Sequence, residues 1–392
     1  MPSLSPLLAR TLLLAPLFCG CGGGEPSPDE NARVGTYYAD IKPLFDAKCV
    51  SCHVEGGLGP FPLTSYDDAF GLRASIQRAV TERAMPPWLA AAGCNEYAAD
   101  ASLDDAQIAA ISAWVDAGAP EGDPADEGPP IETGPSLALS RVDLTLAPAE
   151  AYVADPLGDD YRCFVIDWPE EESLFVTGFR TNPDDVASVH HAIAFVAAPG
   201  DVASVLALDA AEEGPGYTCY GGPLAAASWL GVFTPGSGGA DFPAGTGIRV
   251  DPGSKLILQI HYSPRNGAPR ADRTSVDLKL DASVEREAWI QPWFDPSWYG
   301  EGAMLIPAGA ADVSYSVSYD PTLFVTQGRP LVMHTAGLHM HALGKSGSLA
   351  IVRESGDTEC LLDIPRWDFH WQGAYAFAEP KVLRPGDRIA QE

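Results

Sequence analysis

The first third of the chain carries apolar residues at helical spacing. Ile41, Leu44 and Phe45 fall at positions i, i+3 and i+4, as on one face of an α-helix. Patterns of this kind predict helices over residues 38–48, 67–84 and 102–117, the last beginning with a capping box at Ser102-Leu-Asp-Asp105. We therefore expect this region to be all helical.

After residue 138 the pattern changes to short runs rich in β-branched and aromatic residues, separated by Gly, Pro, Asn and Asp. Such a pattern is typical of an antiparallel β-sandwich or jelly roll. The length of this part suits two small β-domains. The predicted strands are residues 175–179, 191–196, 255–262, 276–280, 314–317, 323–326, 331–335 and 348–352.

The stretch between these two parts is rich in Pro, Gly and acidic residues, a composition that does not pack a core. We predict a linker over residues 121–137, after a helical domain of residues 36–120. The β-rich part is predicted to divide into residues 138–283 and 284–392. A leader of residues 1–21 and a tether of residues 22–35 precede the helical domain.

The leader has a short apolar core, residues 12–18, that is too short to span a bilayer and is typical of an export signal. It ends in Cys19-Gly-Cys21 and resembles a bacterial lipoprotein signal, in which a small residue precedes the lipidated cysteine. Cys21 is the expected lipidation site, with an ordinary signal peptide as the alternative. Either way we expect an exported protein, periplasmic or at the cell surface, in which disulfides are permitted. Lipidation at Cys21 would anchor it to the outer membrane.

The formal net charge is −29, from 53 acidic and 24 basic residues. So acidic a chain repels nucleic acid and anionic membrane surfaces, and we exclude a nucleic-acid partner. Contact with a membrane is expected only through the lipid anchor.

The helical region contains Cys49-Val-Ser-Cys52-His53, the attachment pattern of c-type haem. Two thiols at this spacing reach the two haem vinyl groups, and the adjacent imidazole meets the iron. Met85, followed by two prolines, is the candidate sixth ligand, with a core methionine as the alternative. A redox dithiol or half a zinc site would use the same Cys-x-x-Cys, but the histidine and the exported context disfavour both. We expect a cytochrome c domain acting as a one-electron relay.

Histidines are scarce, eight in the whole chain, yet most of them are grouped. His339 and His341 would share one face of a strand and reach one ion. His190 and His191 would face opposite ways unless a bulge lets both reach one metal, for which His261 would supply a third nitrogen. Three imidazoles and an open position suit copper or zinc. The alternative is a set of unrelated polar or core histidines.

Four motifs in the β-rich part, in their order and spacing, resemble the copper type II, ascorbate-dependent monooxygenases. That family comprises the peptidylglycine α-hydroxylating and dopamine β-monooxygenases. The resemblance implies two consecutive eight-stranded antiparallel jelly-roll sandwiches, each with one copper, facing each other across a solvent-filled cleft. The motifs are Tyr161-Arg-Cys163, His190-His191, Leu258-Gln-Ile-His261-Tyr and His339-Met-His341-Ala-Leu-Gly-Lys345.

The resemblance also implies roles for single residues. His190, His191 and His261 would hold an electron-transfer copper, and His339 and His341 the copper that binds O₂, with Gln259 as a further catalytic residue. The family's methionine ligand to the second copper has no match here, since Met304, Met333 and Met340 do not fit its position. We expect either a sequence truncated at Glu392 or a variant that lacks this ligand. The remaining cysteines are expected as follows: Cys163 and Cys219 in a disulfide, Cys360 with a partner beyond Glu392, and Cys94 with no evident partner.

These expectations combine into an exported monooxygenase that hydroxylates a C–H bond with O₂, its electrons passing through the fused haem domain. Its expected partners are O₂, an organic substrate that the sequence does not identify, and ascorbate or an electron-donor protein. A non-enzymatic haem and copper electron carrier is the alternative. A zinc hydrolase is disfavoured because no His-Glu-x-x-His motif is present. His334 and His370 receive no role.

Overall fold

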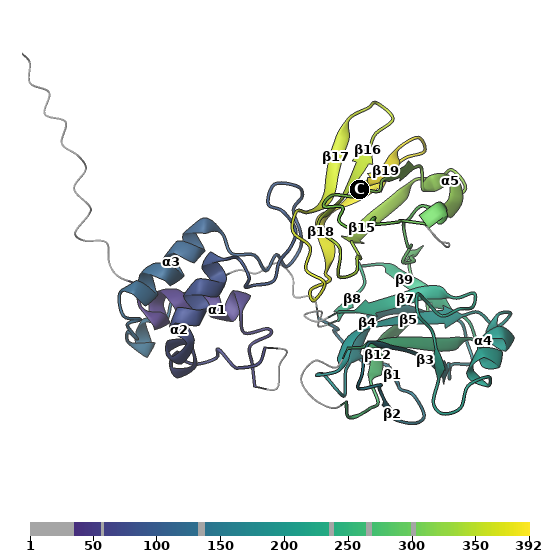
Figure 1. Ribbon diagram of the computed structural model, residues 1–392, viewed down its shortest axis with the longest axis horizontal. Helices are drawn as coiled ribbons and strands as arrows, with labels where there is room; N and C mark the ends of the chain where they lie inside the picture. The colour runs from purple at the N-terminus through teal and green to yellow at the C-terminus, as the bar shows by residue number, and fades with distance from the viewer. Residues whose placement is uncertain (1–34, 56–58, 132–137, 235–238, 264–268, 299–302) are drawn as a thin grey trace, which may run out of the picture.

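The computed structural model describes residues 35–55, 59–131, 138–234, 239–263, 269–298 and 303–392. A helical part, here residues 35–131, is followed by a first β body, residues 138–290, and a second β body, residues 291–392 (Figure 1). The predicted export signal and Cys21 lie outside the described residues. No helix within the described ranges is long and apolar enough to cross a membrane.

The helical part packs around aromatic residues. Its elements are the π-helix η1 (Tyr37–Ile41), α1 (Lys42–Lys48), α2 (Tyr66–Thr81), α3 (Asp105–Asp116) and the 3-10 turn η2 (Pro124–Asp126). Tyr37, Phe45 and Trp114 are fully buried in one cluster, which explains the helical spacing of the apolar residues. The predicted cap of α3 is wrong by two residues. Asp104 caps it, accepting from the Gln107 backbone N–H while the Gln107 side chain accepts from Asp104 N–H.

The first half of the predicted linker lies against the helices. The backbone N–H of Gly128 donates to the carbonyl oxygen of Tyr38 at 3.1 Å, and Lys42 pairs with Glu127 at 2.8 Å. Residues 121–131 therefore belong to the helical part in the folded chain.

Two antiparallel layers form the first β body. One sheet has the order β1-β12-β4-β9-β13, with β8 on β4 and only β13 parallel; the other has the order β6-β3-β10-β5-β7. A short β2–β11 pair and the helix α4 (Val202–Asp209) complete it. The strands are β1 (Leu144–Leu146), β2 (Tyr152–Val153), β3 (Asp160–Asp167), β4 (Leu174–Asn182), β5 (Val189–Ala197), β6 (Tyr217–Thr218), β7 (Ser228–Phe233), β8 (Ala240–Asp241), β9 (Thr246–Val250), β10 (Lys255–Tyr262), β11 (Ala271–Asp272), β12 (Ser275–Asp281) and β13 (Arg286–Glu287).

Strand β10 is buried on both faces, and this places the site. Leu256, Leu258 and Ile260 point into the core between the two sheets. Ile257, on the opposite face, packs in a second cluster beside α4. Because side chains alternate along a strand, His261 shares that second face with Ile257.

Removing the disulfide between Cys163 and Cys219 should destabilise the first β body by about 2–5 kcal/mol. The structure contains this predicted disulfide, with both residues fully buried in the cluster beside α4. In a Cys163→Ala/Cys219→Ala variant, amide hydrogen exchange in β3 and β10 should accelerate, because that exchange reports the opening free energy of this unit. The same exchange should be unchanged in Cys94→Ala/Cys360→Ala, whose disulfide lies elsewhere. Equal β3 protection in all three proteins would contradict the expectation.

The second β body has a four-stranded sheet, β14-β19-β16-β17, and a β15–β18 pair. Residues 323–326, predicted as a strand, lie almost wholly in the helix α5, because Asp320 accepts from the Thr322 backbone N–H at the turn into it. Only the last residue of the predicted strand 314–317 is in β14. The elements are β14 (Val317–Tyr319), α5 (Thr322–Val325), β15 (Leu331–Gly337), β16 (Gly347–Val352), β17 (Thr358–Ile364), β18 (Ala374–Leu383), β19 (Arg388–Gln391) and the turn η3 (Pro296–Trp298).

The loop that follows α2 leaves the helices and completes the core of the second β body (Figure 1). A disulfide joins Cys94 to Cys360, so the expectations of no partner for Cys94 and a partner beyond Glu392 for Cys360 were wrong. The Tyr97 hydroxyl donates to the carbonyl oxygen of Leu361 at 2.9 Å. The pairing joins residues 266 positions apart, and only the folded chain brings them together.

Candidate metal centre

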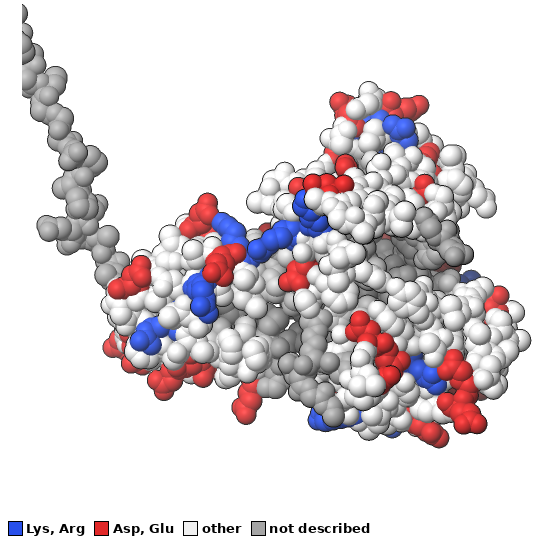
Figure 2. Space-filling model, in the orientation of Figure 1, with Lys and Arg blue, Asp and Glu red and all other residues white. Residues whose placement is uncertain are grey.

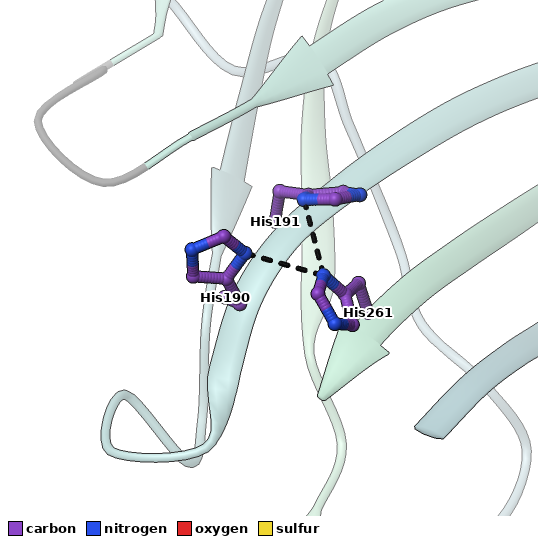
Figure 3. A group of neighbouring side chains, drawn as sticks. All are labelled: His190, His191 and His261. Atoms are coloured by element: carbon purple, nitrogen blue, oxygen red, sulfur yellow. Dashed lines mark hydrogen bonds between the residues drawn. The ribbon is translucent and has the colours of Figure 1, made fainter. Parts of the chain in front are cut away.

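Three histidines meet at one end of the five-stranded sheet (Figure 3). His261 pairs with His191 across β10 and β5, but the next residue of β10, Tyr262, pairs with Val189. His190 is therefore the extra residue of a β-bulge. The bulge turns its ring to the side where His191 and His261 lie, which is the arrangement that the sequence required for a shared metal.

The ring nitrogens of this triad have the spacing of metal ligands. The Nδ1 atom of His261 lies 3.2 Å from Nδ1 of His190 and 3.4 Å from Nδ1 of His191. With metal–nitrogen bonds of about 2.0 Å, two nitrogens on a tetrahedral or trigonal ion lie roughly 3.3–3.5 Å apart. The three ligand atoms all fall within 4.8 Å of one another. The donor set therefore fits a single copper or zinc ion.

Two neighbours fix the ring of His261. The ring stacks on Tyr161, with centroids 4.1 Å apart and an interplanar angle of 6°. On its far edge Nε2 approaches a carboxylate oxygen of Asp159 at 3.4 Å. The pKa of Asp159 is lowered overall, so this carboxyl group is ionised. Partial burial acts to raise the pKa, but the hydrogen bond with Ser263 and the nearby His261 lower it by more. A carboxylate at Nε2 favours the tautomer with its proton on Nε2, in which the Nδ1 lone pair can bind metal.

The triad is buried, and burial keeps the ring of His191 neutral. Burial, and then the neighbouring His261, lower the pKa of His191 to about 2. A neutral imidazole is the form that binds metal, so proton competition at this ring is weak. Phe369 of the second β body stacks on His190 with centroids 5.0 Å apart and covers the triad from that side.

His339 and His341 lie beside the triad. The predicted strand for these residues is wrong, because β15 ends at Gly337. Their rings nevertheless remain neighbours, with centroids 5.2 Å apart. The ring of His339 lies 6.1 Å from that of His191, so the two β bodies bring five histidines into one region.

Gln372 orients His339. Its Oε1 lies 2.5 Å from Nδ1 of His339, and its Nε2 donates to the carbonyl oxygen of Phe369 at 3.0 Å. Because Oε1 only accepts, His339 carries its proton on Nδ1 and leaves Nε2 for a metal. One side of His339 is exposed to solvent, and the protein covers the other side. This partial desolvation lowers the pKa of His339, although the hydrogen bond with Gln372 acts to raise it.

Two methionines lie close to His339 and His341 in the sequence, and both pack against the protein core. Met333 and Met340 pack against the core of the second β body, as expected for a Met340 that points away from its neighbours. Neither supplies the methionine ligand that the resemblance implies.

Two further histidines belong to neither the triad nor the pair. His334 is half-buried, and burial and then the charge of Arg286 lower its pKa. His370 is exposed and interacts with Asp368 at 3.1 Å.

Gln259 is buried on the same face of β10 as His261. Its amide Nε2 donates to the carbonyl oxygen of Cys219 at 2.5 Å. This contact connects the strand that carries His261 to the disulfide. A catalytic role for Gln259 stays a prediction.

Three residues around the site were not predicted from the sequence: Asp159, Gln372 and Phe369. The only local signal was the position of Asp159, two residues before Tyr161.

The haem motif has a donor arrangement that fits covalent haem. Cys49 and Cys52 are free cysteines, whereas the other four described cysteines form disulfides. Nδ1 of His53 lies 3.0 Å from the carbonyl oxygen of Phe61, and the two rings stack with centroids 4.8 Å apart. The carbonyl fixes the proton on Nδ1 and leaves Nε2 for iron. A Cβ at Gly59 would lie 2.4 Å from this ring, so the turn requires glycine.

The thiol of Cys49 does not have the lowered pKa of a reactive dithiol. Burial, with smaller contributions from Cys52 and Asp46, raises the pKa of Cys49 to about 12. Reactive dithiols instead have a depressed pKa. Met85 lies in the loop after α2 with its side chain 44% exposed, and its role as the sixth ligand stays a prediction.

No family model and no curated protein matches the chain.

Proposed function

We propose that this protein is an exported copper-dependent monooxygenase that hydroxylates a C–H bond with O₂, with electrons relayed through a fused c-type haem domain. The observation that carries the proposal is the convergence of three Nδ1 atoms at ligand spacing in the first β body, next to the His339 and His341 pair of the second. Neither set alone would suggest two cooperating metal sites.

In this proposal the two β bodies are the two jelly-roll sandwiches of the copper type II, ascorbate-dependent monooxygenases. The antiparallel sheets and the buried disulfide between Cys163 and Cys219 support that assignment. Copper, when bound, supplies one-electron transfer and the activation of O₂. The chain contributes the imidazoles of His191 and His339, whose pKa is lowered, the tautomers favoured by Asp159 and Gln372, and the cover of Phe369 over the triad.

The helical part is, in the same proposal, a cytochrome c domain. Cys49 and Cys52 attach the haem, while His53 and Met85 are its axial ligands. A His/Met pair favours electron transfer over oxygen chemistry, so this domain relays single electrons. The external donor is ascorbate or a small electron-carrier protein.

A non-enzymatic electron carrier is the second candidate, and one observation favours it. His339 and His341 offer two imidazoles, while Met333 and Met340 pack into the core. Two imidazoles leave Cu(I) under-coordinated compared with the triad. A carrier would need only the haem and the three-histidine site.

Metal content and oxygen chemistry separate these candidates. We expect the purified full chain to contain one iron and up to two coppers, and the reduced protein to consume O₂ faster with copper than after its removal. Iron with a single copper and no copper-dependent O₂ consumption would favour the carrier. Zinc in the triad in place of copper, or iron alone, would contradict both.

A further inference from the structure

The loop after α2 is part of the second β body as much as of the helical part. Ala90 and Tyr97 are buried in the core of that body, and Trp88 packs against it. The backbone N–H of Ala91 donates to the carbonyl oxygen of Asp363, and that of Ala98 to Ala376, both at 2.8 Å. Together with the disulfide at Cys94, these contacts hold the residues that directly follow Met85 in a fixed place.

Trp88 is the first aromatic residue after Met85, and it contacts Tyr375 of β18. Their ring centroids lie 4.9 Å apart at an angle of 86°, and the Leu89 backbone N–H reaches the Tyr375 hydroxyl at 3.3 Å. Tyr97 closes the group, 5.9 Å from Trp88 and 5.5 Å from Tyr375. Tyr375 itself is only 2% exposed, so water is excluded from this contact.

From Tyr375 the path continues to His339. A Cβ built on Gly373 would lie 3.2 Å from the Tyr375 ring, so the ring rests on the backbone next to Gln372. Gln372 in turn holds His339 at 2.5 Å. Strands β18 and β15 pair Tyr375 with Ala336 and Ala374 with Gly337, which places Tyr375 beside the end of β15, two residues before His339.

We propose that Trp88, Tyr375 and Gln372 form the electron-transfer path between the haem of the helical part and the metal site at His339. The inference rests on the proposed function. The transfer moves one electron, oxidising Fe(II) to Fe(III) and reducing Cu(II) to Cu(I), with no bond broken and no proton transferred. An external one-electron donor of the ascorbate or small-cytochrome class reduces the iron again. The ring of His191, 6.1 Å beyond that of His339, extends the path to the triad.

This path gives a reason for the fixed attachment of the loop after α2 to the second β body. A haem domain tethered by a flexible linker would meet the copper sites by diffusion. Here a disulfide and backbone hydrogen bonds hold the haem loop against the body that carries His339. Because electron tunnelling falls steeply with distance, a fixed contact through packed groups gives a constant intramolecular rate.

Pulse radiolysis of the full chain, loaded with haem and Cu(II), tests the path. A sub-stoichiometric pulse reduces the haem, and its absorbance then reports reoxidation by copper. Trp88→Leu should slow this reoxidation several-fold, and Trp88→Phe should fall between it and the wild type. Trp293→Leu is the matched control, since Trp293 packs against the same core and stacks on Tyr319, away from the path. It should leave the rate unchanged.

The outcomes separate the inference from the proposed function. Reoxidation that is equally fast in Trp88→Leu and in the wild type, with iron and copper bound in both, overturns the path and leaves the function. A wild-type haem that stays reduced beside bound copper also overturns the path. Absence of copper or of haem from the protein overturns both. If Trp88→Leu fails to fold, comparison of Trp88→Phe with Trp293→Phe decides by the same criterion.

Discussion

Replacing His261 with alanine should abolish the tight copper equivalent of this protein. Titration of the metal-free chain with Cu(I) should show one tight and one loose equivalent in the wild type. His261 is the centre of the triad, because its Nδ1 faces both His190 and His191. Loss of an orienting residue alone costs about 10–100-fold in metal affinity, and loss of a ligand should cost more than about 100-fold.

Two further variants make this result specific. His341→Ala should remove the loose equivalent and keep the tight one. His370→Ala is the matched control, since that exposed histidine contacts Asp368 outside the cluster, and should change neither. Two equally tight equivalents in the wild type would mean that another donor completes the second site. If His261→Ala still binds copper tightly, the triad is not the site.

The second large effect concerns the helical part. The double variant Cys49→Ser/Cys52→Ser should lose all covalently attached haem. The two free thiols sit beside a His53 ring whose Nδ1 is held by the carbonyl oxygen of Phe61, which leaves only Nε2 for iron. Haem staining of denatured protein, with the intact mass, measures the attachment.

Met85→Ala is the control for this experiment. It should keep the covalent haem and lose only the weak far-red charge-transfer band of Met–iron(III) ligation, because attachment depends on the thiols and not on the sixth ligand. A wild type without that band has another axial ligand. Haem attached equally well to the serine variant would contradict the assignment of the motif.

The surface charge agrees with the expected absence of a nucleic-acid partner. Figure 2 shows acidic side chains over the helical part and both β bodies, with a short row of basic side chains where the helical part meets the second β body. One contact at this junction is the guanidinium of Arg366, 3.5 Å from the carbonyl oxygen of Arg83. That expectation still rests on the net charge and stays a prediction.

Elements with a strong local pattern were predictable from the sequence. The strand at residues 255–262 was predicted with the bounds that the structure gives it. It is buried on both faces, and such a strand carries an almost continuous run of apolar residues, here between Leu256 and Ile260. Residues 323–326 were predicted as a strand because Leu-Phe-Val-Thr has high β-propensity. The turn at Asp320 and Pro321, where the Asp320 side chain accepts from the Thr322 backbone N–H, begins a helix there instead, and in so short a segment this turn outweighs propensity.

The candidate site divides in the same way. The sequence by itself determined which donor groups are present, since Cys-x-x-Cys-His and the grouped histidines can be recognised in the sequence as groups able to hold a metal ion or a haem. Only the tertiary structure decided the geometry: the bulge that turns His190, the meeting of His339 with His191, and the pairing of Cys94 with Cys360. Backbone periodicity acts between near neighbours and can be read from the sequence. Contacts between segments hundreds of residues apart depend on how complete cores pack, and no local pattern records them.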